Sequence, residues 1–301
     1  MGNQYDNAAM NTLFRISLSI GASYLRNVPI KNGRWRIIKY FLPMLRANGS
    51  KLGEKIVHTQ YGFLFNADLG DWLGQYVYLT GCYEPPTARV IATLLNPGDT
   101  FIDVGANSGF FTLLGSHVVG ANGRVLAFEP VPSMRSRLNG NLSLNSAENV
   151  VIHDIALSNK AGKQLFHEGP PGHKGLSSLR SLSNEATTFS VSTMPLDDLL
   201  DDEYSINLIK IDVEGAEQLV INGMQRLLAR QKPHIVIEVT DGYLNALGNN
   251  AVTLCQSLCD LGYRMYRIAE EELIPMEPNA AAKIAQYNAL FTCKTLPTSL
   301  N

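Results

Sequence analysis

Asp103-Val104-Gly105-Ala106-Asn107-Ser108-Gly109-Phe110 follows the apolar run 101–104 directly and precedes a predicted helix. In an open α/β sheet, ligands bind beyond the carboxyl ends of the strands, and glycines let a backbone approach a ligand where a Cβ would clash. Gly105 and Gly109 meet that requirement. The stretch therefore predicts the first strand-to-helix turn of a ligand-binding α/β domain.

Outward from this turn, short β-branched apolar runs alternate with helical patterns. Such alternation is typical of βαβ units in a parallel sheet covered on both faces. Two later runs, 263–268 and 289–293, would complete a seven-stranded, mostly parallel sheet of the Rossmann-like α/β class. The five runs that alternate with helices are 101–104, 124–128, 150–153, 206–211 and 234–238.

Composition and turn residues predict three regions. Residues 1–55 are basic and helical, 56–98 form a hairpin and a helical cap that begins at Glu84-Pro85-Pro86, and 99–301 form the Rossmann-like domain.

An insert at 163–192 is rich in Gly, Pro and Ser and is flanked by alternating segments. Long irregular segments in compact domains are often functional, so its part at 169–182 is predicted to be a lid or an acceptor-binding loop.

Charge is distributed unevenly along the chain. Residues 1–60 carry a net +7 and the remainder −9, for a total of −2. The basic segment 34–46 is typical either of a solvated cap or of a helix that contacts an anionic membrane surface or a partner. The near-neutral total and the lack of a basic aromatic stripe exclude nucleic acid as the expected substrate.

The most apolar early segment, 16–25, is too short to span a bilayer and has no small-residue cleavage site. The sequence therefore predicts neither an anchor nor a signal peptide, and hence a cytoplasmic protein. It is compatible with a homo-oligomer and does not specify one.

The glycine turn differs from the dinucleotide fingerprint, because G-x-N-x-G replaces G-x-G-x-x-G and Asp103 precedes the first glycine. A pyrophosphate would be repelled there. The ammonium and sulfonium of S-adenosylmethionine suit an acid at this position. The residues assigned to this cofactor at the turn are Asp103, Gly105, Ala106, Asn107 and Gly109.

Acids at the ends of the next two strands extend this prediction. Glu129 ends the second run, twenty residues beyond Gly109, where a carboxylate can accept both ribose hydroxyls of an adenosine. After the third run, Asp154 is predicted to accept from the adenine amine, and Ile155 or Ala156 to pack on the ring or donate to it from the backbone. His153 is either a general base or a core histidine.

The fourth run ends in Lys210-Ile211-Asp212-Val213-Glu214-Gly215, and the fifth ends at Glu238. Acids grouped at strand ends cost stability unless they serve a ligand or a proton transfer. Asp212 and Glu214 are therefore the candidate catalytic residues, with Lys210 and Glu238 on the substrate side. No fixed ligand spacing predicts a dedicated metal site, although carboxylates here can hold a divalent ion.

At these residues the sequence resembles the FkbM family of methyltransferases over roughly residues 56–294. The matching stretches are 103–109, Glu129-Pro130, 210–215, 83–85, 177–179, 195–198 and 288–291. The resemblance implies a class I methyltransferase fold, cofactor contacts at Asp103, Gly105, Asn107 and Glu129, and Glu84 closing over the site. It also places Ser177 and Ser178 with the acceptor.

The family resemblance implies O-methylation of a hydroxyl on a sugar, a polysaccharide or glycolipid, or a small natural product. Two alternatives stay open. A nicotinamide-dependent oxidoreductase or epimerase is disfavoured by the missing G-x-G-x-x-G and the absence of a Tyr-x-x-x-Lys pair. A catalytically inactive cofactor-binding scaffold is disfavoured because Asp103, Glu129 and Asp212 are all present.

Overall fold

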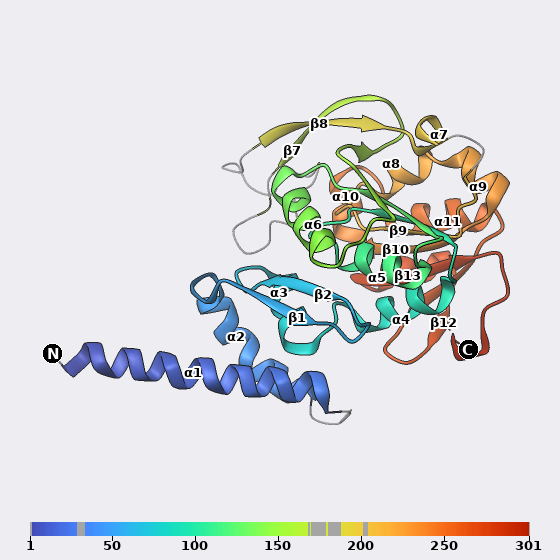
Figure 1. The fold of residues 1–301 in the computed structure, drawn as a ribbon. Coiled ribbons are helices and arrows are strands. Elements are labelled where there is room, and N and C mark those ends of the chain that lie inside the picture. Colours follow the sequence, from blue (N-terminus) through green and yellow to red (C-terminus); the bar gives the residue numbers. More distant parts are fainter. Residues whose placement is uncertain are drawn as a thin grey trace. The chain divides into compact units, whose positions relative to one another are not determined.

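A computed structural model describes residues 2–28, 34–167, 169, 179, 188–200 and 204–300, with the backbone alone described at 2–13, 34 and 35. The chain forms two compact units, Met1–Tyr83 and Glu84–Asn301. In Figure 1 the first is blue to cyan and the second runs from cyan-green to red.

The first unit consists of three helices and a hairpin. Helix α1 (Gly2–Asn27) buries Leu18, Ala22 and Leu25 on one face, and α3 begins at Asp71, whose carboxylate accepts from the Leu73 N–H. The predicted helical region and the hairpin are both present. None of the helices in the described part of the chain is long and apolar enough to cross a membrane. The other elements are α2 (Arg34–Leu52), β1 (Glu54–His58), β2 (Leu64–Asp68) and α3 (Trp72–Thr80).

The second unit is built on one large sheet with the order β12-β11-β13-β10-β9-β3-β4-β5. Strands β10, β9, β3, β4 and β5 are parallel, while β13 is antiparallel to both β10 and β11. The strands are β3 (Thr100–Val104), β4 (Arg124–Phe128), β5 (Val150–His153), β9 (Leu208–Ile211), β10 (His234–Thr240), β11 (Arg264–Ile268), β12 (Leu273–Pro275) and β13 (Gln286–Thr292).

The sheet has eight strands where the sequence predicted seven. The additional strand, β12, pairs with β11 at the edge of the sheet and is only three residues long. Its last residue is Pro275, which an edge strand tolerates because one side of it forms no ladder. A run this short, ending in proline, lacks the alternation from which strands are predicted.

Helices cover the sheet on both faces because of the strand order. The chain passes from β3 through β4 to β5 in one direction and from β9 to β10 in the other, and right-handed crossovers then place α5 and α6 opposite α8 and α9 (Figure 1). The helices are α4 (Pro85–Leu94), α5 (Phe110–Val119), α6 (Pro132–Leu144), α7 (Leu196–Leu199), α8 (Glu217–Asn222), α9 (Gln225–Gln231), α10 (Asp241–Ala246) and α11 (Ala251–Asp260), with 3-10 turns at Pro278–Lys283 and Thr298–Leu300.

Helix α4 belongs to the second unit, where it contacts α5, β10 and β11. The sequence analysis grouped it with the hairpin, because the asparagine, proline and glycine at 96–98 mark a break after it. The apolar face of α4, with Val90, Ile91 and Leu94 buried, is the reason that it packs on the large domain.

A small second sheet includes both flanks of the predicted insert and a strand that precedes it. Strands β6 (Ala156–Leu157), β7 (Gly162–His167) and β8 (Thr188–Met194) pair in the order β6-β8-β7. The alternating segments that flank the insert are therefore strands. The predicted lid at 169–182 falls outside the described residues, apart from positions 169 and 179.

Candidate active site

The candidate site lies where the crossovers diverge, at the carboxyl ends of β3 and β9. These strands are neighbours, with Asp103 opposite Lys210 and the Asp212 N–H bonded to the Val104 carbonyl at 3.0 Å. The chain leaves β3 toward one face of the sheet and β9 toward the other. A crevice forms at such a switch point, and it is the usual ligand site of open α/β sheets.

The two glycines of the turn are required by packing within the protein. Gly105 has φ +83°, and a Cβ built on it would lie 1.9 Å from the Asp212 carbonyl oxygen. Gly109 has φ +93°, and its Cβ would lie 2.4 Å from Leu138 Cδ1. From the sequence, these glycines were predicted to make room for a ligand. In the structure the close approaches are made by the loop after β9 and by α6.

Glu129 is held against the glycine turn by backbone donors. Its Oε2 accepts from the Asn107 N–H and its Oε1 from the Val131 N–H, both at 2.8 Å. The side chain is buried, and this burial raises the pKa of Glu129 to about 7 although both hydrogen bonds favour the ionised form. Asn107 has φ +53°, a conformation that costs energy outside glycine and recurs at functional sites.

A buried lysine occupies the space between the two strand ends. Lys210 Nζ lies 3.0 Å from Asp212 Oδ2 and 4.7 Å from the centre of the Phe111 ring. Burial lowers its pKa, but the charges of Asp212, Asp103 and Glu84 outweigh burial and raise the pKa of Lys210 above its usual value. Lys210 is therefore the permanent cation of this cluster.

Asp103 contributes a charge from inside the sheet. It has no exposed surface, and its Oδ2 accepts from the Thr112 hydroxyl at 2.6 Å. Burial raises the pKa of this carboxyl, while Lys210 and the Thr112 hydrogen bond oppose the rise. Direct contact between Asp103 and a cofactor stays a prediction.

Glu84 reaches the cluster from the start of α4. Asn288 Nδ2, on β13, donates to Glu84 Oε2 at 2.9 Å and to the Thr87 hydroxyl at 3.0 Å. Burial and the Asp212 charge raise the pKa of the Glu84 carboxyl. The backbone of Glu84 has φ +43°, a strained conformation for a residue other than glycine. The hydrogen bond from the Asn288 amide therefore holds the carboxylate of a strained residue in place.

Three carboxylates meet beside this group. Asp212, Glu214 and Glu238 each place one oxygen within 4.8 Å of the others. Burial raises the pKa of Glu238 well above its usual value, and the neighbouring charges of Asp212 and Glu214 add to the shift, while the 2.5 Å hydrogen bond from Gln286 opposes it.

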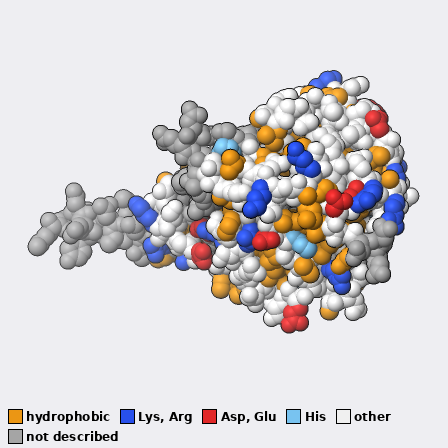
Figure 2. Space-filling model, turned by 90° about the horizontal axis from the view of Figure 1, so that it is seen from above, with side chains coloured by type: hydrophobic (Ala, Val, Ile, Leu, Met, Phe, Trp, Pro, Cys, Tyr) orange, Lys and Arg blue, Asp and Glu red, His pale blue; other side chains and the backbone are white. Residues whose placement is uncertain are grey.

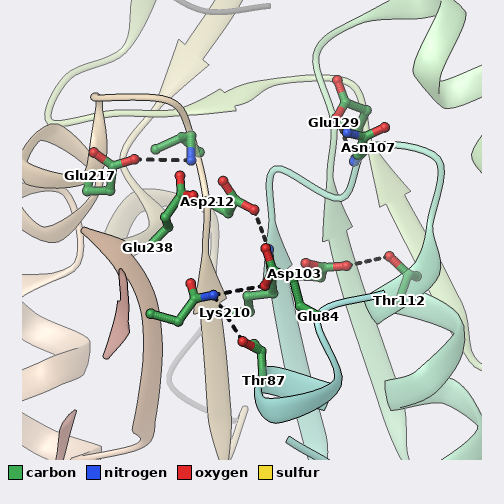
Figure 3. Close-up of polar contacts among 12 residues, drawn as sticks. Glu84, Thr87, Asp103, Asn107, Thr112, Glu129, Lys210, Asp212, Glu217 and Glu238 are labelled. Atoms are coloured by element: carbon green, nitrogen blue, oxygen red, sulfur yellow. Dashed lines mark hydrogen bonds and ion pairs between the residues drawn. The ribbon is translucent and has the colours of Figure 1, made fainter. Parts of the chain in front are cut away.

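Figure 3 shows Asp103, Lys210, Asp212 and Glu238 directed toward one another from β3, β9 and β10, with Glu84 alongside, while Glu129 and Asn107 lie apart from them. If the strand continued past Ile211, alternation of its side chains would place Asp212 and Glu214 on one side of the sheet. Instead β9 ends at Ile211, and Glu214 has φ +58° in the turn that follows. The acids meet because this turn folds back toward β10.

The predicted residues around β5 are not part of this cluster. His153 ends β5, which β3 and β4 separate from β9, a distance of about 14 Å at the usual spacing of strands. Its ring stacks on Phe128 at 4.7 Å, burial lowers its pKa, and its carbonyl accepts from the Glu129 N–H. Asp154 is exposed, and Ala156 begins β6. Ser177 and Ser178 fall outside the described residues.

Several residues were missed by sequence reasoning. Thr112 and Thr87 carry no signal by themselves, whereas Asn288 lies in a stretch that was noticed only through the resemblance. Glu217, the first residue of α8, was given no role. It accepts from the Gly215 and Val213 N–H groups at 3.0 and 3.3 Å and so fixes the loop between β9 and α8. Figure 3 shows it bonded away from the lysine cluster.

Two curated methyltransferases and one solved structure are among the proteins similar to this chain. Methyltransferase 1 of Beauveria bassiana is 26% identical over 192 residues, 57% of this chain and 74% of that protein. Hexuronic acid methyltransferase AglP of Haloferax volcanii is 27% identical over 161 residues, 53% of this chain and 63% of that protein. The solved structure of methyltransferase FkbM from Methylobacillus flagellatus is 18% identical with a TM-score of 0.42, over 84% of this chain and 59% of that chain.

The family model described as "Methyltransferase FkbM domain" matches residues 103–265, which is more than half of the chain. The matched region begins at the acid of the glycine turn and includes Glu129, Asp212 and Glu238. The chain therefore belongs to the FkbM family of methyltransferases, on a Rossmann-like α/β fold.

Proposed function

We propose that this protein transfers the methyl group of S-adenosylmethionine to a hydroxyl of a sugar, a polysaccharide or glycolipid, or a small natural product. The observation that carries the proposal is the position of Glu129 at the switch-point edge, buried against the Asn107 amide. The cluster around Lys210 lies on the other side of the same glycine turn. One turn thus separates a hydroxyl-accepting carboxylate from a group of acids suited to proton transfer.

The residues present fit this cofactor. Each Glu129 oxygen accepts one backbone N–H and retains a lone pair for a ribose hydroxyl. Charge-assisted hydrogen bonds of this kind are among the stronger ones in proteins. Three carboxylates, Asp212, Asp103 and Glu84, act on the single ammonium of Lys210 and leave the adjoining edge acidic, which favours a sulfonium and an ammonium over a pyrophosphate.

Bound S-adenosylmethionine supplies an electrophilic methyl group on a positively charged sulfur. The protein then has to align an acceptor oxygen with that methyl group, exclude water and receive the hydroxyl proton. Asp212, Glu214 and Glu238 are the candidate proton acceptors. A carboxyl with a raised pKa is the more effective base near neutral pH, and Glu238 has this property.

Lys210 keeps these acids together. Its 3.0 Å ion pair orients the Asp212 carboxylate and offsets the repulsion among the three acids. The Lys210 ammonium is buried and paired with Asp212, so we propose that Lys210 positions this carboxylate. Contact between Lys210 and the substrate stays a prediction. His153 is proposed to line the adenine side with Asp154 and Ala156, because it shares the end of the sheet with Glu129.

The acceptor class is supported by a relative. AglP is named as a hexuronic acid methyltransferase, and it aligns with this chain over 63% of its own length. A carbohydrate hydroxyl is therefore the first acceptor to test. The 27% identity supports the class of acceptor and not a particular sugar.

The test is incubation of the full chain with methyl-labelled S-adenosylmethionine and three acceptor sets: hexuronic acid glycosides, neutral hexosides and polyketide alcohols. Mass spectrometry reads the gain of one methylene unit, and formation of S-adenosylhomocysteine is measured in parallel. We expect label in a carbohydrate, and none with Glu129→Ala at limiting cofactor. Binding of a nicotinamide nucleotide in place of S-adenosylmethionine, or cofactor binding without transfer to any acceptor, would refute the proposal.

A further inference from the structure

The first unit, Met1–Tyr83, exposes more large apolar side chains than the rest of the chain. Seven such side chains are exposed in the described part of the protein, and five of them lie in this unit although it is the smaller one. Scattered single apolar residues are normal on a surface, whereas a concentration of them indicates contact with another body. The five are Ile16, Ile20, Tyr24, Tyr40 and Ile56.

Three of them form a stripe along α1. Ile16, Ile20 and Tyr24 are 51%, 65% and 40% exposed and are spaced four residues apart, so they lie on one face of the helix. Leu18, Ala22 and Leu25 on the opposite face are buried within the unit. Helix α1 therefore has two apolar faces, and its own unit covers only one of them.

The same unit is basic. It carries nine lysines and arginines against four acidic residues, a net +5, whereas residues 84–301 carry −7. Arg36, Lys39 and Arg46 are exposed along one side of α2. The Arg46 guanidinium lies 4.3 Å from the centre of the Trp72 ring, so its charge is held at the surface.

We propose that α1 and α2 dock on an anionic lipid surface, with Ile16, Ile20 and Tyr24 inserted among the acyl chains and the basic side of α2 over the headgroups. Basic residues beside an apolar helical face are the combination that binds such surfaces. Over the part of α1 whose side chains are described, a stripe of three side chains is too narrow to make the roughly 800 Å² per partner of a stable protein interface.

The visible surface in Figure 2 shows no comparable excess of one charge. On the face seen in Figure 2, basic and acidic side chains are interspersed with hydrophobic and uncharged ones. Charges of both signs that lie close together largely cancel beyond a Debye length. The first unit is therefore the part that an anionic surface would attract.

The test is co-sedimentation of the full chain with vesicles, without cofactor or acceptor, so that its result is independent of the methyl transfer proposed above. One set of vesicles is phosphatidylcholine, and the other contains about 30% phosphatidylglycerol. We expect binding to the anionic set alone, and its loss at about 0.5 M NaCl. Ile16→Ser combined with Ile20→Ser should weaken binding by about tenfold or more.

Two further variants separate the components. Arg36→Glu with Lys39→Glu should weaken binding to the anionic vesicles. Leu165→Ser removes an equally exposed apolar side chain, 63% exposed, from the second unit and should bind like the wild type. Unchanged binding by the isoleucine double variant would overturn the proposal. So would equal binding to both vesicle sets, or a wild-type dimer in sedimentation equilibrium that this double variant dissociates.

Discussion

Acids occupy two different settings along one edge of the large sheet. After β4, Glu129 is bonded by two backbone N–H groups and lies apart from the lysine cluster. Asp212 and Glu214 after β9 and Glu238 within β10 crowd together beside the single ammonium of Lys210. Residue type is nearly the same in both settings, while the partners differ.

The difference indicates what each setting can bind. Backbone amides hold the Glu129 carboxylate in one orientation and leave lone pairs for neutral donors, which suits ribose hydroxyls. The crowded group has more negative than positive charge, so a proton or a cation lowers its energy. Recognition is therefore proposed for the first setting and proton transfer for the second.

The largest expected effect comes from a substitution at Gly105, where the glycine turn touches the backbone of Asp212. A side chain at Gly105 would meet the Asp212 carbonyl at 1.9 Å from its Cβ, and φ is +83°. Gly105→Val should lower the free energy of unfolding by about 3 to 5 kcal/mol and abolish cofactor binding as well. Urea denaturation measures this change. Gly140→Ala in α6, where a Cβ meets nothing within 4 Å, is the control and should be neutral or slightly stabilising.

Asp212→Asn tests the crowded setting. The substitution keeps the shape and removes the charge that Lys210 faces. We expect kcat to fall by roughly 10²- to 10⁴-fold with the affinity for S-adenosylmethionine nearly unchanged. Steady-state kinetics and calorimetry separate the two quantities, and exposed Glu272→Gln serves as the control. A loss of cofactor affinity would instead show that Asp212 binds the cofactor, and the proposed difference in role between Asp212 and Glu129 would be wrong.

Glu129→Ala tests the recognition setting. Losing the charge-assisted hydrogen bonds to ribose should weaken cofactor binding by about 1.5 to 3 kcal/mol, which is roughly 10- to 150-fold. Isothermal titration calorimetry with S-adenosylhomocysteine measures this without turnover. At saturating cofactor, kcat should change much less than for Asp212→Asn. If the affinity were unchanged, ribose could not be bound here.

The smallest expected effect is a dependence on pH. Burial raises the pKa of Glu129 to about 7, and only the ionised form accepts from both hydroxyls. Cofactor affinity should therefore fall as pH decreases through 7, by up to about tenfold between pH 8 and pH 6. Glu129→Gln has no such titration and should bind with nearly the same affinity at both values. Parallel pH profiles for the two proteins would assign the titration to another group.

Sequence reasoning succeeded where the signal is local. Apolar runs predicted seven strands of the large sheet, and the missing one, β12, is a three-residue edge strand ending in Pro275. It also identified Asp103, Glu129, Asp212 and Glu238 as strand-end acids. It did not separate His153 from the Asp212 cluster, because a strand's place in the sheet order is not encoded in its own residues.

By itself the sequence determined the strand–turn–helix at 100–119 and the acid after each central strand, because periodicity, glycine and strand length act within a few residues. Only the tertiary structure decided which acids share a site. Glu84 and Asn288 are 204 positions apart and meet through a 2.9 Å hydrogen bond, and Gly105 is required by the Asp212 backbone. These pairings depend on the strand order and on where each chain segment turns, which arise from burying the whole core at once.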